Sequence, residues 1–265
     1  MRKHWTKRLF VDKASIYQEQ LEELFEQSIQ QVEELQSLLS ELRVPEGGWI
    51  LDLACGVGRH STLLGEKGYR VVGVDLSPTF IARAREIAEE RSVSERVEFR
   101  VGDMRNVGEL LGGFESRFAA VLSMFTSLGY YDEETDGRIL AQLLELTVPG
   151  GILVIEIVNR DALIRRFQEK DFFQLPDDKL QLAERRLDLE TSRMHNVWRW
   201  YREEGRDLKH LETVELDHRV YSLHELKGLV EDSGWEYVGG YGGFQQEPLT
   251  MDSFRMVLIG RKPAA

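Results

Sequence analysis

Short apolar runs that alternate with amphipathic stretches constrain the fold of this chain more than any other feature of its sequence. Five such runs lie at residues 49–53, 71–74, 97–101, 118–123 and 152–158. Each is apolar nearly throughout, as is typical of parallel strands that helices cover on both faces. Between two of them, Ser77 and Pro78 predict a helix N-cap followed by the first helical residue. The sequence therefore predicts an α/β protein with a doubly wound sheet.

The segments on either side of this alternation predict other structures. Apolar residues recur through residues 15–42 as in one amphipathic helix, packed on the domain. Residues 181–221 alternate between apolar or aromatic and polar side chains, which predicts a half-exposed antiparallel meander. A capping box at Ser222 begins a further helix, and residues 235–241 and 254–260 predict two last strands. The loop between these strands is too short for a crossover helix, so we expect them to be antiparallel neighbours.

Composition narrows the possible partners and the compartment. Lys and Arg number 34 against 46 Asp and Glu, so the net charge is −12 at pH 7, which disfavours nucleic acid and anionic membrane surfaces. The single cysteine, Cys55, allows no intramolecular disulfide and fits a reducing compartment. No run approaches the roughly 18 apolar residues of a membrane span, and the first residues lead into no signal-peptide core. We expect a soluble, cytoplasmic protein without nucleic-acid or membrane partners.

Residues that can bind a ligand lie where the predicted strands end. After the first strand, Gly56 and Gly58 carry no Cβ, so a ligand can approach the backbone beside the N-terminus of the next helix. Asp75 ends the second strand, where a carboxylate can accept both hydroxyls of an adenosine ribose. Asp103 and Met104 follow the third strand, where the carboxylate can accept from an adenine amine. The three strand ends together predict an adenosine site.

The carboxylate of Asp52, directly before the glycine turn, decides which adenosine compound fits. A pyrophosphate at the helix N-terminus would be repelled by this acid, whereas a cationic amino-acid group would be attracted to it. S-adenosylmethionine carries adenine, ribose and an ammonium group but no phosphate. We therefore expect S-adenosylmethionine as the cofactor.

Four ordered segments, at residues 50–58, 73–77, 102–104 and 146–151, resemble the motifs of class I S-adenosylmethionine-dependent methyltransferases. The Ala54-Cys55-Gly56 variant of the first motif resembles that of small-molecule N-methyltransferases of the aminosugar and glycine type. The resemblance implies a Rossmann-like, seven-stranded, mostly parallel sheet with an antiparallel last strand, an inserted antiparallel β lid and N-terminal helices. The cofactor-binding residues it implies are Tyr17, Asp52, Ala54, Gly56, Gly58, Asp75, Leu76, Asp103, Met104 and Ser123. At Ala54, where the family has glycine, a small side chain suffices if φ stays negative; Cys55 we interpret as a packing residue.

The resemblance also divides the chain into parts of one methyltransferase domain. These are an N-terminal helical cap over residues 1–48, a cofactor-binding core over 49–160, an inserted substrate lid over 161–221 and the rest of the core over 222–265. Within the cap, the aromatic segment from Trp5 to Tyr17 resembles the flap that closes over the methionine end of the cofactor. It can equally be a plug of the hydrophobic core.

The acceptor site is less defined by the sequence. The loop at 124–131 lacks the Asn/Asp-Pro-Pro-aromatic segment of many family members that act on nucleic acids or protein amides. Candidate acceptor-side residues are Tyr130 in this loop and His195, Arg199 and Tyr201 in the meander, where only one parity of each strand can face a pocket. A hydroxyl acceptor would need a base such as His195, His210 or His218, and two histidines with Glu212 between them make no metal site.

These observations favour methyl transfer to a small-molecule amine, because in-line displacement depends more on orientation than on a base. The alternatives are an RNA methyltransferase and a non-catalytic regulatory protein that binds an adenosine ligand.

Overall fold

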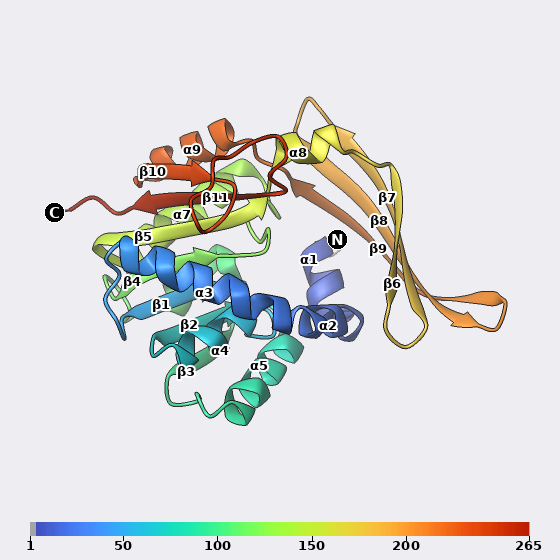
Figure 1. The fold of residues 1–265 in the computed structure, drawn as a ribbon, viewed down its shortest axis with the longest axis horizontal. Helices are drawn as coiled ribbons and strands as arrows, with labels where there is room; N and C mark the ends of the chain where they lie inside the picture. The colour runs from blue at the N-terminus through green and yellow to red at the C-terminus, as the bar shows by residue number, and fades with distance from the viewer. Residues whose placement is uncertain (1–3, 265) are drawn as a thin grey trace.

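The computed structural model describes residues 4–264 and contains the expected α/β sheet (Figure 1). Within these residues seven strands pair in the order β10-β11-β5-β4-β1-β2-β3. Their bounds are β1 (Trp49–Leu53), β2 (Arg70–Asp75), β3 (Val97–Val101), β4 (Phe118–Ser123), β5 (Thr147–Val158), β10 (Glu236–Tyr241) and β11 (Arg255–Arg261). The last strand, β11, runs antiparallel to both β5 and β10, which confirms the predicted fold class. β5 begins before residue 152, since a register irregularity lets residues 147–151 extend the strand.

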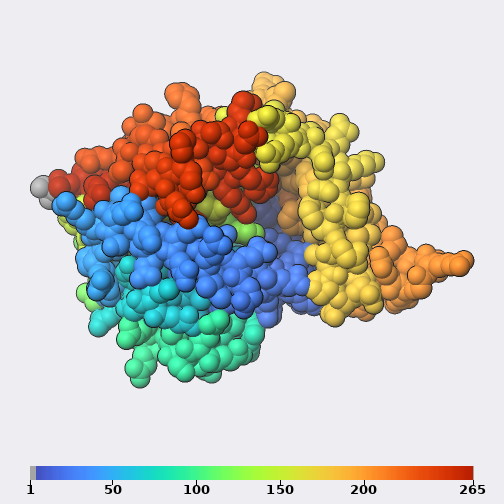
Figure 2. All heavy atoms as spheres, viewed as in Figure 1, coloured from blue at the N-terminus to red at the C-terminus, as the bar shows by residue number. Residues whose placement is uncertain are grey.

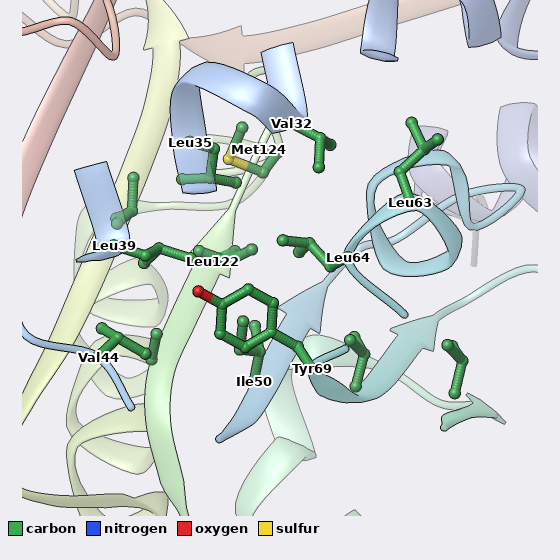
Figure 3. Packing of buried hydrophobic residues seen from close by; sticks show 14 of the residues in the cluster. Val32, Leu35, Leu39, Val44, Ile50, Leu63, Leu64, Tyr69, Leu122 and Met124 are labelled. Carbon is green, nitrogen blue, oxygen red and sulfur yellow. The ribbon is translucent and has the colours of Figure 1, made fainter. Parts of the chain in front are cut away.

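Helices cover both faces of the sheet. One face carries α3 (Phe25–Glu41), α4 (Arg59–Glu66) and α5 (Pro78–Glu90), and the other carries α6 (Val107–Leu110), α7 (Glu133–Leu146) and α9 (Leu223–Asp232). Figure 3 shows Val32, Leu35 and Leu39 of α3 beside Leu122 of β4 and Leu64 of α4. The predicted caps are confirmed, because Ser77 Oγ accepts from the N–H of Phe80 and Ser222 forms a capping box. No helix of residues 4–264 is long and apolar enough to cross a membrane.

The expected single helix over residues 15–42 is wrong, because the structure divides it into α2 (Ala14–Glu23) and α3. The break lies at Leu24, whose carbonyl accepts from Ser28 Oγ at 2.8 Å and from Arg59 Nη1 at 3.2 Å. Arg59 comes from α4, so a contact distant in sequence stabilises the break. Before α2 lie α1 (Trp5–Lys7) and a π-helical turn, η1 (Arg8–Asp12).

The predicted meander is confirmed as an antiparallel sheet, called the lid sheet below, that follows α8 (Arg160–Arg165). Its four described strands are β6 (Lys170–Leu175), β7 (Lys179–Asp188), β8 (Arg193–Glu204) and β9 (Asp207–Arg219). The sequence did not indicate β6, since this edge strand buries none of its residues and so lacks an apolar alternation. In Figure 1 the lid sheet stands apart from the seven-stranded sheet, with α1 and α2 between them. Trp5 and Leu9 pack there against Trp200.

Candidate functional site

A cavity, called the strand-end cavity, lies beyond the carboxyl ends of β1, β2, β3 and β4. Loops after these strands supply most of its walls, and Thr6, Phe10, Tyr17 and Leu21 from the N-terminal segment supply the rest. Figure 2 shows a hollow on one face of the molecule, between the red C-terminal segment, the blue N-terminal helices and the yellow part of the lid sheet. Carboxyl ends of strands are where open α/β sheets bind their ligands.

The glycine turn after β1 borders this cavity, and Ala54 in it corrects one expectation. Ala54 has φ of +59°, not a negative value. The left-handed conformation turns the chain so that the next residue, Cys55, donates its N–H to the carbonyl of Val74 at 3.1 Å. An L-residue there carries a strain of roughly 1–2 kcal/mol, which glycine avoids. Burial raises the pKa of the Cys55 thiol well above its ordinary value, so it stays protonated and packs in the wall.

Gly58 and Ser123, two of the residues expected at the cofactor, are not among the lining residues of the cavity. A Cβ on Gly58 would lie 2.6 Å from the ring of Phe99, and φ is +76°, so glycine is needed there for packing and for the turn. Ser123 is buried, and its hydroxyl lies 3.0 Å from that of Ser127, which does line the cavity. Gly58 and Ser123 therefore lie behind the residues that line the cavity.

Asp75 reaches the cavity from the end of β2, and Leu76 follows it in the wall. Its carboxylate accepts from the N–H of Gly56 at 2.9 Å and from the N–H of Ser77 at 2.8 Å. Burial raises its pKa from 3.8 to about 6. Because each oxygen of a carboxylate can accept two hydrogen bonds, both can still accept one hydroxyl each. Asp75 therefore holds the glycine turn in place and retains the capacity to bind a ribose.

Asp52, the last polar residue of β1, is also buried in the wall. Ser61 Oγ donates to its Oδ2 at 2.5 Å. Burial raises the pKa of Asp52 from 3.8 to about 6, although Ser61 and the nearby Arg59 favour the ionised form. A bound ammonium group would offset this desolvation, so the carboxylate suits a cationic ligand.

Asp103 and Met104 also line the cavity, on the side of β3. Asp103 Oδ1 accepts from the backbone N–H of Arg105, and the guanidinium of Arg105 donates to Oδ2 at 2.6 Å. Hydrogen bonds to Arg105 outweigh burial and lower the pKa of Asp103. Its carboxylate thus caps the short helix η2 (Met104–Asn106) and stays ionised, which keeps it able to accept from an amine.

Arg59, which was not among the residues predicted from the sequence, follows the glycine turn and lines the cavity with only 5% of its surface exposed. Its Nη1 donates to Ser28 Oγ at 2.7 Å, and its guanidinium lies 5.1 Å from the centre of the Phe125 ring. A cation facing the same cavity as Asp52 gives the wall both charges. This pair matches a ligand that carries an ammonium and a carboxylate. The only sequence signal was a basic residue beside two glycines.

The loop after β4 is the second feature that the sequence did not show. Phe125 and Thr126 both have positive φ, +56° and +62°, which is strained for side chains of this size. Glu156 holds the strained pair, because its Oε2 accepts from the N–H of Phe125 at 2.7 Å. Arg255 Nε lies 3.1 Å from Glu156 Oε1, and its guanidinium faces the Phe125 ring at 4.8 Å. Residues from β5 and β11 therefore fix the position of the Phe125 ring in the wall.

A second cavity, called the lid cavity, lies between this loop and the inner face of the lid sheet. Phe10, Tyr17, Phe125 and Tyr130 line both cavities. From β8 the lid cavity receives Met194, Asn196 and Trp198, and from β9 it receives Leu216 and His218. The even-numbered residues of both strands therefore face inward. The expected acceptor-side candidate Tyr130 lies where the two cavities meet.

This parity excludes three of the acceptor-side candidates from the lid cavity. His195, Arg199 and Tyr201 are odd-numbered residues of β8 and do not line the lid cavity. Arg199 pairs with Glu184 at 3.0 Å, and His195 borders a different groove. The ring of Tyr201 contacts that of His210 at a centroid distance of 5.5 Å. The expectation that these residues face the pocket is wrong, because the alternation fixes which residues share a face but not which face is buried. Among residues 4–264, no group of three His, Cys, Asp or Glu side chains is placed to hold a metal ion.

His218 is the histidine that the fold brings to the lid cavity. Burial and the nearby Arg193 lower its pKa from 6.5 to about 4, so its imidazole is neutral at pH 7. A group of this pKa is a weak base.

The N-terminal segment combines the two roles that the sequence left open. Trp5 and Leu9 belong to a buried cluster with the lid sheet, as a plug does. Phe10 and Tyr17 line both cavities, and the Tyr17 ring stacks on Trp198 at 6.1 Å. One side of the segment is therefore core and the other side is cavity wall.

Comparisons with known proteins agree with this geometry. Residues 50–151 match a family model described as a methyltransferase domain. A putative methyltransferase of Bacillus subtilis (strain 168), YqeM, is 32% identical over 139 residues, 52% of this chain and 53% of that protein. The dTDP-3-amino-3,4,6-trideoxy-alpha-D-glucopyranose N,N-dimethyltransferase of Streptomyces venezuelae is 33% identical over 115 residues, 43% of this chain and 44% of that protein. The matched part thus spans about half the length of these relatives.

A solved structure matches over more of the chain. The CcbJ methyltransferase from Streptomyces caelestis superposes with a TM-score of 0.74, covering 88% of this chain and 90% of that one. The sequences are 22% identical, so this similarity shows a common fold that includes most of the chain.

Proposed function

We propose that this chain, whose residues 50–151 match a family model described as a methyltransferase domain, is a cytoplasmic enzyme that transfers a methyl group from S-adenosylmethionine to a small-molecule amine. The observation that carries the proposal is the shared wall between the two cavities. Four aromatic residues, Phe10, Tyr17, Phe125 and Tyr130, line both. A donor in the strand-end cavity and an acceptor in the lid cavity would meet at this wall.

The strand-end cavity fits S-adenosylmethionine group by group. Asp75 would accept hydrogen bonds from the ribose hydroxyls, and Asp103 would accept one from the adenine amine. Asp52 would attract the ammonium, and Arg59 would attract the carboxylate. Asp52 and Asp75 are both buried acids with raised pKa values, as is expected of groups that await hydrogen-bond donors or a cation.

The chain's own residues contribute orientation and the exclusion of water. When bound, S-adenosylmethionine would supply a methyl group on a sulfonium: the N–C bond to a neutral amine would form as the C–S bond breaks, S-adenosylhomocysteine would leave, and the methylated nitrogen would lose its proton to solvent. Aligning two such reactants can account for roughly 7–11 kcal/mol of the barrier. The aromatic wall holds the acceptor beside the donor cavity and keeps the reacting atoms dry.

An amine acceptor is favoured over a hydroxyl because of the base that the lid cavity offers. A hydroxyl must lose its proton during attack, and His218, with its pKa near 4, is a weak acceptor of that proton. A neutral amine attacks without such help. The name of the Streptomyces venezuelae relative, an N,N-dimethyltransferase, points in the same direction.

Incubation with S-adenosylmethionine and separate panels of amines, phenols and RNA tests the proposal, with formation of S-adenosylhomocysteine as the readout. We expect turnover with amines and product inhibition by S-adenosylhomocysteine. Turnover with RNA alone would identify an RNA methyltransferase. Tight cofactor binding without turnover on any panel would identify a regulatory binding protein.

A further inference from the structure

The lid cavity contains a guanidinium whose hydrogen-bonding capacity is largely unused. Arg185, on the inner face of β7, places Nη1 and Nη2 both 3.4 Å from a single oxygen, Oδ2 of Asp171. Charge-assisted hydrogen bonds are ordinarily about 2.7–2.9 Å long, so this contact is weak. The side chain is only 20% exposed. A guanidinium has five N–H donors, and most of those on Arg185 lack a partner among the described residues.

Asn196 lies beside Arg185, since the two residues are register partners between β7 and β8. It is 4% exposed, it lines the lid cavity, and its side-chain amide forms no hydrogen bond with any residue in the described part of the chain. Trp5 lines the same cavity, and its buried indole N–H also has no partner among residues 4–264. Buried polar groups are nearly always hydrogen-bonded in proteins, so donors that lack a protein partner and face one cavity are available to a ligand.

The charges around the cavity show what kind of ligand complements these donors. Its lining residues include two arginines, Arg185 and Arg255, and neither aspartate nor glutamate. Glu156 is close to Arg255 and neutralises it, whereas Asp171 only weakly engages Arg185. The wall near Arg185 and Asn196 is therefore rich in donors and cationic, in a protein whose net charge is −12.

We propose that Arg185 and Asn196 bind an anionic group, a carboxylate or a phosphate, on the methyl acceptor. The inference rests on the proposed function for the identification of the lid cavity as the acceptor site. The acceptor class is thus an amine that also carries a negative charge. Its apolar part lies against the aromatic rings of Tyr17 and Trp198.

Calorimetric titration with three probes of similar size tests the proposal. Benzoate and phenyl phosphate carry an anion on an aromatic ring, and benzyl alcohol carries none. Each probe is titrated into the full-length protein, with and without saturating S-adenosylhomocysteine. We expect at least one anionic probe to bind at least about tenfold more tightly than benzyl alcohol, and the stronger of the two identifies carboxylate or phosphate.

Two variants and a control assign this preference to the residues. Arg185→Gln should remove the preference for the anionic probes. Asn196→Ala should weaken this preference several-fold, and it tests the proposal if Arg185→Gln does not fold. Arg186→Gln removes the same charge from the next residue, which is exposed on the outer face, and should retain the preference. Equal binding of benzyl alcohol and the anions, or an equal loss in Arg186→Gln, would overturn the proposal. The affinity for S-adenosylhomocysteine, measured in the same samples, reports separately on the proposed function.

Discussion

Replacement of Asp52 by asparagine should stabilise the folded protein and weaken its binding of S-adenosylmethionine. Asp52 is 1% exposed, and its carboxylate accepts a hydrogen bond from Ser61. The amide of asparagine keeps an oxygen that can accept this bond. It cannot ionise, so the variant removes a buried negative charge at almost constant volume.

The structure gives the magnitude and the sign of the stability effect. Burial raises the pKa of Asp52 from 3.8 to about 6, and each pKa unit is worth about 1.4 kcal/mol, so the ionised group opposes folding by about 3 kcal/mol. Between pH 4 and 6 the folded state retains a proton that the unfolded state has lost, so stability falls as the pH rises through this range. The variant should therefore gain about 3 kcal/mol at pH 7 and almost nothing at pH 4. In this size class that gain raises Tm by roughly 5–10 °C.

The binding effect has the opposite sign. A charge-assisted bond to an ammonium is worth roughly 1.5–3 kcal/mol, so the variant should bind S-adenosylmethionine roughly 10- to 100-fold more weakly. Denaturant unfolding at pH 4 and pH 7 measures the first effect, and calorimetry measures the second. A stability difference that does not grow between these pH values would refute the reasoning.

Asp136→Asn is the matched control for this prediction. Asp136 on α7 is also fully buried, with its pKa raised to about 6, but it accepts from Tyr221 and does not line the strand-end cavity. The Asp136→Asn variant should gain stability between pH 4 and pH 7 as Asp52→Asn does, and its affinity for S-adenosylmethionine should be unchanged.

Three further outcomes are expected. In the Asp52→Asn variant, where position 52 no longer titrates, protonation of Asp75, whose pKa is about 6, removes an acceptor for the ribose, so the Kd of S-adenosylmethionine should rise about tenfold per pH unit below 6; calorimetry of this variant that gives a constant Kd from pH 5 to 8 contradicts the assignment. Asp103→Asn should change the ratio of affinities for S-adenosylmethionine and its inosine analogue, and an unchanged ratio argues against the adenine contact. Tyr130→Phe should alter the KM or kcat for the acceptor, whereas Tyr201→Phe, on the outer face of β8, should alter neither; steady-state kinetics that show equal effects for the two variants would contradict the assigned faces.

The prediction of the core from the sequence succeeded because its signals are local. Strands buried on both faces consist of consecutive apolar residues, so β1 and β4 are visible as runs. Helix caps depend on residues three positions apart, as Ser222 and Glu225 do in their capping box. The acids Asp52, Asp75 and Asp103 stand at strand ends, and parallel strands bring such ends to one edge of a sheet. All three line the strand-end cavity.

The face of the lid sheet that borders the lid cavity depends on contacts that no local pattern contains. An alternating strand shows that residues of one parity share a face, but which face is buried depends on what packs against the sheet. Here Trp5 and Leu9 pack against Trp200, so His218 faces the cavity and His195 does not.

Backbone strain and the helix break also depend on contacts between residues that are distant in the chain. Phe125 adopts a positive φ because Glu156, from a neighbouring strand, accepts its N–H. The helix break at Leu24 involves the guanidinium of Arg59. Short-range patterns in the sequence specify the seven-stranded sheet and the acids at its strand ends. The buried face of the lid sheet, the strained loop after β4 and the donors of Arg185 and Asn196 are set by the tertiary structure, because each depends on partners distant in the chain.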